Sequence, residues 1–458
     1  MKILNDYLNQ WKEYLITLRP IQMAHLAFAL SKYLFWAHLA RNRCDAYSAT
    51  LQHERIARTT PRWNLSPTIM KINLELIATM KERNGPNILR QCFIESNESY
   101  RYREEFQQYG AEYQVRLKYP RPNVDPCRQG DVIVLKPHMS SKERGVLLIQ
   151  YNDSFKKFFA IFDTARLAKS YRLVLEPSTW GYCDPLILLF LGMETDVIVQ
   201  AQHHLDFEYI RSIESNLVPL RLGAGDWIDP DRFFVGPANA KVYDIVMVAS
   251  WQRIKRHELL FRNAKKCPDI VKRIALIGYP SEGRDKEDVM REAKKHGVLT
   301  KIDFYESIPR QQVSEIIRQS KIGVMLTVRE GSNKGIYECF FSDVPVIISE
   351  RNIGVNRAHV NPHTGITVED CLLADGIRHL VMNSESYEPR QWALEHTGYR
   401  NASYALNECL KGLAGKNGEE WTQDIYVKKN DTNAQYVFEN ERSEADKAID
   451  DLRDYLKK

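Results

Sequence analysis

The sequence lacks several features that mark common classes of protein. Its eight cysteines are scattered without a Cys-x-x-Cys pair, so we expect neither a zinc site nor a disulfide framework. It contains no low-complexity tract and no repeat at the periods of solenoid proteins. Its first nineteen residues mix Asp6, Lys12 and Glu13 among apolar ones, which is unlike a signal peptide. These absences favour a cytoplasmic location.

The chain also lacks a strong excess of charge of one sign. A net charge of +5 over 458 residues argues against a dedicated nucleic-acid-binding protein. The charge is uneven, because residues 1–130 carry 19 Lys and Arg against 12 Asp and Glu. A basic, aromatic front end of this kind would meet anionic phosphates, either in solution or at a membrane surface.

A single apolar run is long enough to span a bilayer, namely residues 21–40, "IQMAHLAFALSKYLFWAHLA". Its central Lys32 opposes crossing, since a central lysine costs roughly 2.5–3.5 kcal/mol on insertion scales. Arginines flank the run at positions 19, 41 and 43, which suits a helix lying in the membrane interface better than one crossing it. A buried helix is the favoured interpretation, and peripheral membrane contact through residues 1–90 is the alternative.

The order of apolar segments predicts an α/β protein with several parts. Residues 1–130 are expected to form a mainly helical extension, including a helix over "SPTIMKINLELIATMKERNG". Residues 131–225 and 241–380 each alternate short buried-strand runs with helical patterns, which is typical of doubly wound parallel sheets. We expect a linker over 226–240 and a helical tail over 381–458. The tail ends in an amphipathic helix, "ERSEADKAIDDLRDYLKK".

The second α/β unit contains the stretch "GVMLTVREGSNKGIYECFF", which is predicted to be a strand, a loop and a helix. Ligands bind at the carboxyl ends of such strands, where the following helices begin. Ser332 and Asn333 are good helix-capping residues, and the helix start suits an anion such as a diphosphate. Glu330 precedes this start, and Glu338 lies about 9–12 Å further along the helix. The two carboxylates can accept hydrogen bonds from hydroxyl groups at the two ends of one ligand, with a diphosphate bound between them. A ligand with hydroxylated groups on both sides of a diphosphate is a nucleotide sugar.

The stretch "REGSNKGIYECFFSDVPVIIS" resembles the Glu-x7-Glu signature of retaining glycosyltransferases with the GT-B fold, especially glycosyltransferase family four. The residues that match are Glu330, Gly331, Glu338, Pro345 and Val346, whereas Cys339 replaces the usual Ala and Asp343 the usual Gly. Upstream, "YDIVMVASWQRIKRHELLF" resembles the family's strand, loop and helix with a conserved lysine at Lys255. In "GAGDWIDPDRF", Asp229 and Phe233 match the family's linker pattern. The resemblance spans residues 131–369 and is weakest in the first unit.

The resemblance implies a GT-B fold of two Rossmann-like domains, with the acceptor domain first and the donor domain second. It implies that Lys255 neutralises the donor diphosphate, that Glu330 holds the sugar hydroxyls and that Glu338 holds the ribose. The remaining donor-binding candidates lie in the same two loops: Gly331, Ser332, Asn333, Lys334, Ser250, Arg253 and Arg256. Ser250 stands where the family has an arginine, and Arg253 or Arg256 is the expected substitute. No metal is implied, and Asp229–Asp231 is interpreted as a turn.

The first unit holds the candidates for binding an acceptor. Segments that follow strands contain Glu176, Trp180, Tyr182, His203 and His204, which we expect to line an acceptor pocket. The resemblance implies that His203 or His204 orients an acceptor hydroxyl. The family's glycine-rich loop is missing from this unit. Its place is taken by "KPHMSSKERGV", where Lys142, Arg144 and Gly145 are the candidate replacements.

These features together predict a retaining glycosyltransferase of surface-polysaccharide biosynthesis, with a nucleotide-diphosphate sugar as donor and a saccharide or lipid-linked acceptor. No separate cofactor is expected. Two alternatives stay open, and each has its own basis. A catalytically silent sugar-nucleotide-binding subunit would explain Ser250, and a sugar-nucleotide epimerase or a phosphorylase would use the same fold.

Overall fold

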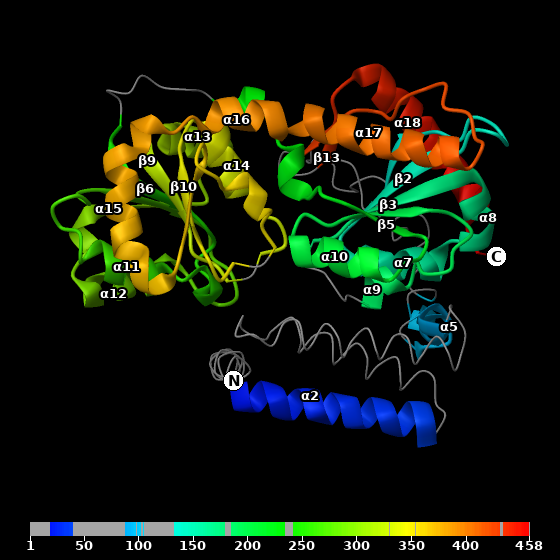
Figure 1. Ribbon diagram of the computed structural model, residues 1–458, viewed down its shortest axis with the longest axis horizontal. Coiled ribbons are helices and arrows are strands. Elements are labelled where there is room, and N and C mark those ends of the chain that lie inside the picture. Colours follow the sequence, from blue (N-terminus) through cyan, green and yellow to red (C-terminus); the bar gives the residue numbers. More distant parts are fainter. Residues whose placement is uncertain are drawn as a thin grey trace. The chain divides into compact units, whose positions relative to one another are not determined.

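The computed structural model describes most of the chain beyond its first part, and Figure 1 shows its elements. The described residues are 19–39, 88–97, 99–101, 104, 132–178, 185–233, 241–328, 330–352, 354–430 and 434–457. They form two compact units. We call the unit that contains residues 225–401 the central unit. We call the unit of residues 10–224 and 402–458 the split unit, because its two long pieces lie far apart in the sequence.

The apolar run near the amino terminus is helical, as predicted. Helix α2 spans Arg19–Leu34 and continues into the π-helical turn Phe35–Leu39. In the described part of the chain, no helix combines the length and apolarity needed to cross a bilayer. The helix predicted for residues 66–85 lies outside the described residues.

The split unit is built on a five-stranded sheet in the order β1-β2-β3-β4-β5. The strands are β1 Val132–Lys136, β2 Gly145–Gln150, β3 Tyr171–Glu176, β4 Val197–Gln200 and β5 Leu217–Leu220. Strands β2 to β5 are parallel, and between them run α7 Asn152–Ile161, α8 Thr164–Ser170, α9 Pro185–Leu188 and α10 His204–Ser212. Helix α5, Ile88–Ile94, packs on α7 and α9.

Strand β1 differs from the prediction, because it pairs with β2 in the antiparallel direction. Val132 is opposite Ile149, and Lys136 is opposite Val146, so β1 and β2 form a hairpin. The loop between them therefore lies at the amino edge of the parallel strands. The expectation of a fully parallel first unit is wrong at this strand.

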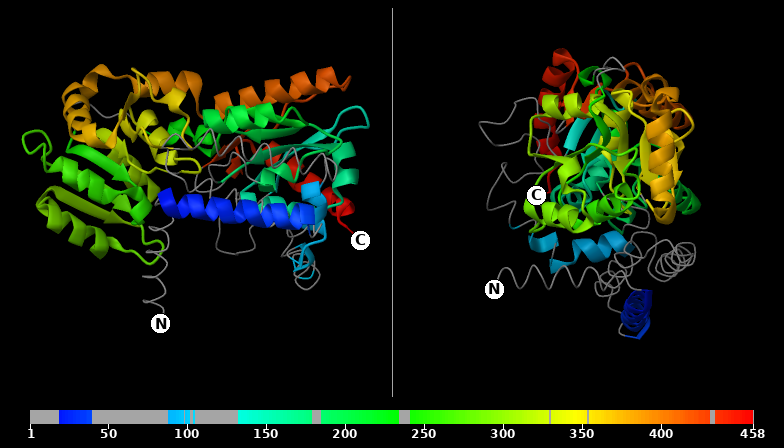
Figure 2. Two further views of the ribbon diagram at one scale, coloured as in Figure 1. Left: turned by 60° about the horizontal axis from the view of Figure 1, so that its bottom comes forward. Right: turned by 90° about the vertical axis from the view of Figure 1, so that its left-hand side faces the viewer.

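The carboxyl-terminal residues supply the second layer of the split unit. Helices α17 Tyr399–Lys416 and α18 Glu439–Asp451 lie on one side of the sheet, while α7, α9 and α10 lie on the other (Figure 1). Figure 2 shows α17, drawn in orange, as one continuous helix. The predicted terminal helix is confirmed as α18, but the tail also contains the hairpin β12 Lys428–Asn430 and β13 Ala434–Tyr436. Because helices cover both faces of the sheet, every residue of β1, β2 and β3 is buried.

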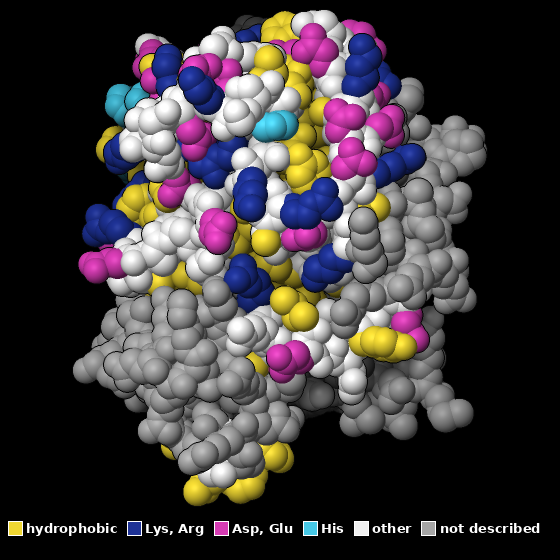
Figure 3. Space-filling view, turned by 90° about the vertical axis from the view of Figure 1, so that its right-hand side faces the viewer, with side chains coloured by type: hydrophobic (Ala, Val, Ile, Leu, Met, Phe, Trp, Pro, Cys, Tyr) yellow, Lys and Arg dark blue, Asp and Glu magenta, His cyan; other side chains and the backbone are white. Residues whose placement is uncertain are grey.

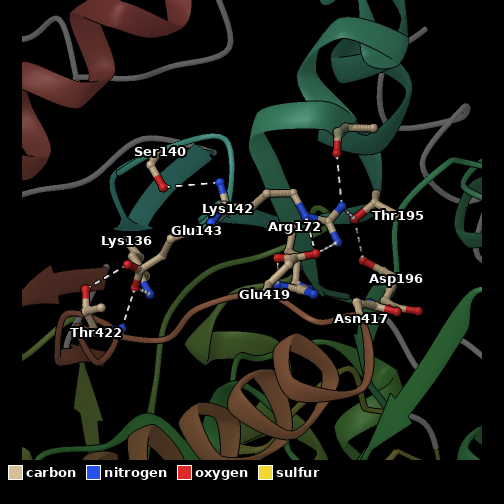
Figure 4. A network of polar contacts seen from close by, with 12 residues as sticks. Lys136, Ser140, Lys142, Glu143, Arg172, Thr195, Asp196, Asn417, Glu419 and Thr422 are labelled. Atoms are coloured by element: carbon tan, nitrogen blue, oxygen red, sulfur yellow. Dashed lines mark hydrogen bonds and ion pairs between the residues drawn. The ribbon is translucent and has the colours of Figure 1, made fainter.

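Residues 417–430, which we call the strap, run along the split-unit sheet from the amino ends of its parallel strands to their carboxyl ends. Near the start of β3, Glu419 accepts a hydrogen bond from Arg172 (Figure 4). It also accepts hydrogen bonds from Arg144, which directly precedes β2. Next, close to the end of β1, the backbone N–H of Tyr426 donates to the carbonyl of Leu135 over 2.6 Å. At the carboxyl edge, Lys428 Nζ lies 2.7 Å from a carboxylate oxygen of Glu176 (residue 176 ends β3).

A second ion pair in the same network holds the β1–β2 hairpin to the strap. Lys136 Nζ lies 2.6 Å from Glu143 Oε1, and both side chains are buried (Figure 4). Glu143 also accepts hydrogen bonds from the N–H and hydroxyl of Thr422, both at 2.7 Å. Burial opposes ionisation of Glu143, yet these partners lower its pKa to about 2. The strap is therefore bound by ionised contacts.

The surface of the described residues is mixed in charge on the face seen in Figure 3. Lys and Arg side chains alternate there with Asp and Glu side chains, and no broad patch of one sign forms among the described residues of this face. Such a surface is ordinary for a globular protein.

The central unit is built on a six-stranded parallel sheet in the order β11-β10-β9-β6-β7-β8. Its strands are β6 Tyr243–Val248, β7 Ile274–Gly278, β8 Ile302–Glu306, β9 Ser320–Met325, β10 Val346–Ser349 and β11 Gly365–Val368. The first five confirm the predicted strands. The helices are α11 His257–Ala264, α12 Lys286–His296, α13 Arg310–Arg318, α14 Lys334–Phe341, α15 Leu373–Asn383 and α16 Pro389–His396.

Two apolar clusters cover the two faces of this sheet. Helices α11, α12 and α15 contribute to one cluster, and α13, α14 and α16 contribute to the other. Helices on both faces of a parallel sheet are the doubly wound arrangement that the sequence predicts.

The start of the predicted linker is packed into the central unit. Trp227, Ile228 and Phe233 are buried, and Gly225 lies so close to Tyr337 that an added Cβ would be 2.4 Å from its ring. Asp229 accepts a hydrogen bond from the N–H of Asp231 and caps a short 3-10 turn, which confirms that this segment is a turn. Residues 234–240 lie outside the described part of the chain.

Candidate functional site

The strand order of the central unit reverses between β6 and β9, where a ligand-binding crevice is expected. The chain leaves β6 toward β7 and β8 on one side, and then returns to β9 and β10 on the other side. At such a reversal the connections diverge, and ligands bind beyond the carboxyl ends of the two strands. The loops that follow β6 and β9 are the two loops that the sequence singles out.

Lys255 and Glu330 meet at this point. Lys255 belongs to the 3-10 turn Arg253–Lys255 after β6, and Glu330 to the loop after β9. Lys255 Nζ lies 2.6 Å from Glu330 Oε1, with side chains only 16% and 11% exposed. The hydroxyl of Thr327 donates to the same carboxylate oxygen over 2.8 Å. A cation and a hydrogen-bonding carboxylate thus stand together at the expected crevice.

The loop after Glu330 leads directly into helix α14. Asn333 caps the helix by accepting a hydrogen bond from the N–H of Ile336 over 3.0 Å. Ser332 accepts one from the N–H of Gly225 over 2.7 Å, and Lys334 is the first helical residue. The positive end of the helix dipole therefore lies next to Gly331 and Ser332.

Glu338 lies within α14 and is nearly buried. Arg310, at the start of α13, contacts Glu338 Oε1 at 2.6 Å. Both glutamates of the motif are therefore paired with basic side chains, Glu330 with one from the loop after β6 and Glu338 with one from the segment after β8. Sequence reasoning missed Arg310; its place at a helix start after a parallel strand was the available signal.

The three remaining candidates after β6 have different surroundings. Ser250 is buried, and its hydroxyl donates to Gln252 Oε1 over 3.1 Å. Arg253 is exposed. Arg256 donates to the carbonyl of Leu326 over 3.0 Å and forms an ion pair with Asp370.

Arg256 therefore ties the loop after β6 to the end of β9. Burial raises the pKa of Asp370, but hydrogen bonding to Arg256 outweighs it and holds that pKa below its ordinary value. The pair is thus charged at neutral pH, and it keeps the two loops of the crevice at a fixed spacing.

The predicted acceptor residues belong to the split unit. His203 is buried after β4, and His204 is exposed as the first residue of α10, with ring centroids 4.6 Å apart. Glu176 is buried and bonded to Lys428 and to Gln150. Trp180 and Tyr182 lie outside the described residues.

The proposed replacement for the glycine-rich loop is wrong. Since β1 is antiparallel, Lys142, Arg144 and Gly145 lie at the amino edge of the parallel strands, and ligands bind at the carboxyl edge. Arg144 there contacts Glu419, so its role is in binding the strap.

Across the described part of the chain, no three His, Cys, Asp or Glu side chains gather in a way that would hold a metal ion.

Part of the chain matches a known protein family. Residues 229–392 match the family described as "Glycosyl transferases group 1". No curated protein matches the chain significantly. Among solved structures, sucrose-phosphate synthase from Thermosynechococcus elongatus is similar at 15% identity, with 72% of this chain and 79% of that one covered and a TM-score of 0.50.

Two other solved structures are similar at lower TM-scores. TarM shares 15% identity over 58% of this chain, with a TM-score of 0.47, and the aligned part spans only 54% of the TarM chain. Anabaena HepE, solved in complex with UDP, shares 12% identity over 59% of this chain and 79% of that one, with a TM-score of 0.47. The similarity to sucrose-phosphate synthase shows the fold, which is mixed α/β with two Rossmann-like domains of the GT-B type. Residues 229–392 are similar to glycosyltransferases of group 1.

Proposed function

We propose that this protein is a retaining, metal-independent glycosyltransferase that uses a nucleotide-diphosphate sugar as donor and a saccharide or lipid-linked acceptor. The observation that supports this most is the meeting of Lys255 and Glu330 between β6 and β9, inside the segment that matches the glycosyltransferase family. A nucleotide-diphosphate sugar needs a cation for its phosphates and acceptors for its hydroxyls, and this crevice offers both.

In the proposed complex, each group of the site contacts one part of the donor. Lys255 and the amino end of α14 hold the diphosphate, Glu330 accepts hydrogen bonds from the sugar, and Glu338 accepts them from the ribose. His203 or His204 orients the acceptor hydroxyl.

In the reaction, the bond between the anomeric carbon and the diphosphate oxygen breaks. The acceptor oxygen bonds to that carbon on the same face, and its proton passes to the departing diphosphate. Lys255 stabilises the negative charge that develops on the leaving group, which is the type of contribution that dominates catalysis in many enzymes.

A thermal-shift panel of UDP, GDP and ADP and their sugars, followed by donor hydrolysis and transfer assays, tests the proposal. We expect Lys255→Ala to lower transfer roughly a hundredfold or more, since loss of one such charge-stabilising group costs that much in other enzymes. Glu330→Ala should lose transfer as well. Asp269→Asn is the control, because Asp269 forms an exposed pair with Arg378 elsewhere in the central unit.

A catalytically silent subunit is the second candidate, and the surroundings of Ser250 favour it. Where the family has an arginine, this chain has a buried hydroxyl bonded to Gln252. Binding of a donor without hydrolysis or transfer across a broad acceptor panel would support this candidate. Interconversion of free sugar nucleotides would instead indicate an epimerase.

We place the protein in the cytoplasm, with peripheral membrane contact through residues 1–90 as part of the proposal. Unchanged membrane partitioning after removal of residues 1–90 would discard that contact.

A further inference from the structure

Lys255 and Glu330 form an ion pair with each other, although the proposed function assigns them to different parts of a donor. Their contact of 2.6 Å joins two loops that follow adjacent parallel strands. Both side chains are mostly shielded from water. Breaking this contact therefore leaves the carboxylate of Glu330 without a cation and poorly solvated, unless the ligand supplies new hydrogen-bond partners.

The carboxylate is the fixed half of this pair. Thr327 is fully buried and donates its hydroxyl to the same oxygen of Glu330 that Lys255 contacts. The carbonyl of Thr327 in turn accepts a hydrogen bond over 2.9 Å from Asn352, which is also fully buried. Lys255 contacts Glu330 through the end of a flexible stem, so a competing anion can draw the ammonium away while Glu330 stays in place.

We propose that this ion pair makes the site discriminate between a nucleotide-diphosphate sugar and the nucleoside diphosphate left after transfer. The inference rests on the proposed function. Either ligand takes Lys255 with its phosphates, and Glu330 then loses its cation. The sugar hydroxyls of the donor compensate Glu330, whereas the nucleoside diphosphate has no group to do so. The pair therefore weakens binding of the product relative to the donor and favours product release.

The test measures dissociation constants of UDP and UDP-glucose, GDP and GDP-mannose, and ADP and ADP-glucose by calorimetry, using the full chain. In Glu330→Gln, Lys255 no longer has to leave a carboxylate. We expect the nucleoside diphosphate to bind roughly three- to tenfold more tightly. This factor corresponds to the free energy of breaking an ion pair that is partly exposed or partly buried. The nucleotide sugar should bind more weakly, so the dissociation constant of the nucleoside diphosphate divided by that of the nucleotide sugar should fall.

Two comparisons separate this effect from a general change of charge. Glu338→Gln removes the other carboxylate of the site, whose partner is Arg310, and it should weaken both ligands alike. Asp269→Asn should change neither constant. If Glu330→Gln does not fold, Glu330→Asp shortens the side chain by one methylene and should change the ratio in the same direction.

The outcomes are distinct for the two proposals. If the wild-type chain binds none of these nucleotides, both the proposed function and this inference fail. If it binds them and Glu330→Gln leaves the affinity for the nucleoside diphosphate unchanged or weaker, the inference alone is refuted. A Glu338→Gln variant that tightens the diphosphate as much as Glu330→Gln also refutes it.

Discussion

Substituting Glu419 by Gln tests how strongly the strap is bound to the split unit. The carboxylate of Glu419 has two arginine partners, with Arg144 at 2.5 Å and Arg172 at 2.7 Å. Arg172 is almost completely buried, with 1% of its side chain exposed, and burial is the main reason that its pKa is lowered. The variant keeps the shape of residue 419 but removes the charge that compensates two cations.

The expected loss follows from the burial of these groups. Removing one partner of a buried ion pair costs about 3–5 kcal/mol, because the other charge stays behind uncompensated. Glu419 and Arg144 keep 14% and 12% of their side chains exposed, and Arg144 retains its bond to Thr195, so we expect about 3 kcal/mol. For a unit of this size that loss corresponds to a decrease in melting temperature of about 6–12 °C.

Hydrogen exchange of the full chain measures this effect separately in each unit. Peptides from β2 and β3 should exchange faster in Glu419→Gln, and peptides from β6 and β9 should be unchanged. Glu420→Gln is the matched control, since Glu420 is the neighbouring residue and its side chain is exposed. It should change stability by less than about 0.5 kcal/mol. Equal exchange in the two variants would refute the role assigned to the strap.

Two further predictions concern the central unit. His257 is buried, neither ring nitrogen has a hydrogen-bond partner among the described residues, and burial, aided by Arg284 and Lys255, lowers its pKa to about 3. The imidazole therefore binds a proton at higher pH in the unfolded state than in the folded state, so stability should fall as pH drops from about 6.5 toward 3. Urea unfolding of His257→Leu should show a smaller fall in stability over this range. Identical pH profiles of the variant and the wild type would contradict this. Gly225→Ala places a Cβ 2.4 Å from the ring of Tyr337, so we expect a loss of about 1–3 kcal/mol in urea unfolding. A stability equal to that of the wild type would contradict this expectation and would show that the ring of Tyr337 moves aside at no cost.

Much of the central unit could be predicted from the sequence, because its strands are short runs of Val, Ile and Leu between helical patterns. Strand β11, "GITV", and strand β5, "LVPL", were missed. Each has only four residues, and a proline lies inside the second, so the apolar pattern was too short to recognise. The antiparallel direction of β1 was missed for a different reason. Only residues 137–144 separate it from β2, and a parallel crossover needs a dozen or more residues, so the loop length carried the information that the apolar pattern did not.

The candidate site was also predictable only in part. Residues near one another in the sequence, such as Glu330, Ser332 and Asn333, could be grouped from their spacing and capping preferences. Partners from distant segments could not. Arg310 on Glu338 and Lys428 on Glu176 depend on which strands become neighbours and on the path of the chain across them. Such pairings follow from the complete fold and leave no periodic trace in the sequence.

The proposed function requires that a nucleotide-diphosphate sugar binds at the carboxyl edge of the central sheet, between β6 and β9. Hydrogen exchange of the full chain with and without saturating UDP-glucose, GDP-mannose or ADP-glucose tests it most directly. We predict that the nucleotide sugar that binds protects residues 250–256 and 326–338. Protection confined to the split unit, protection at the amino ends of the central strands, or no protection with any of the three would contradict the account.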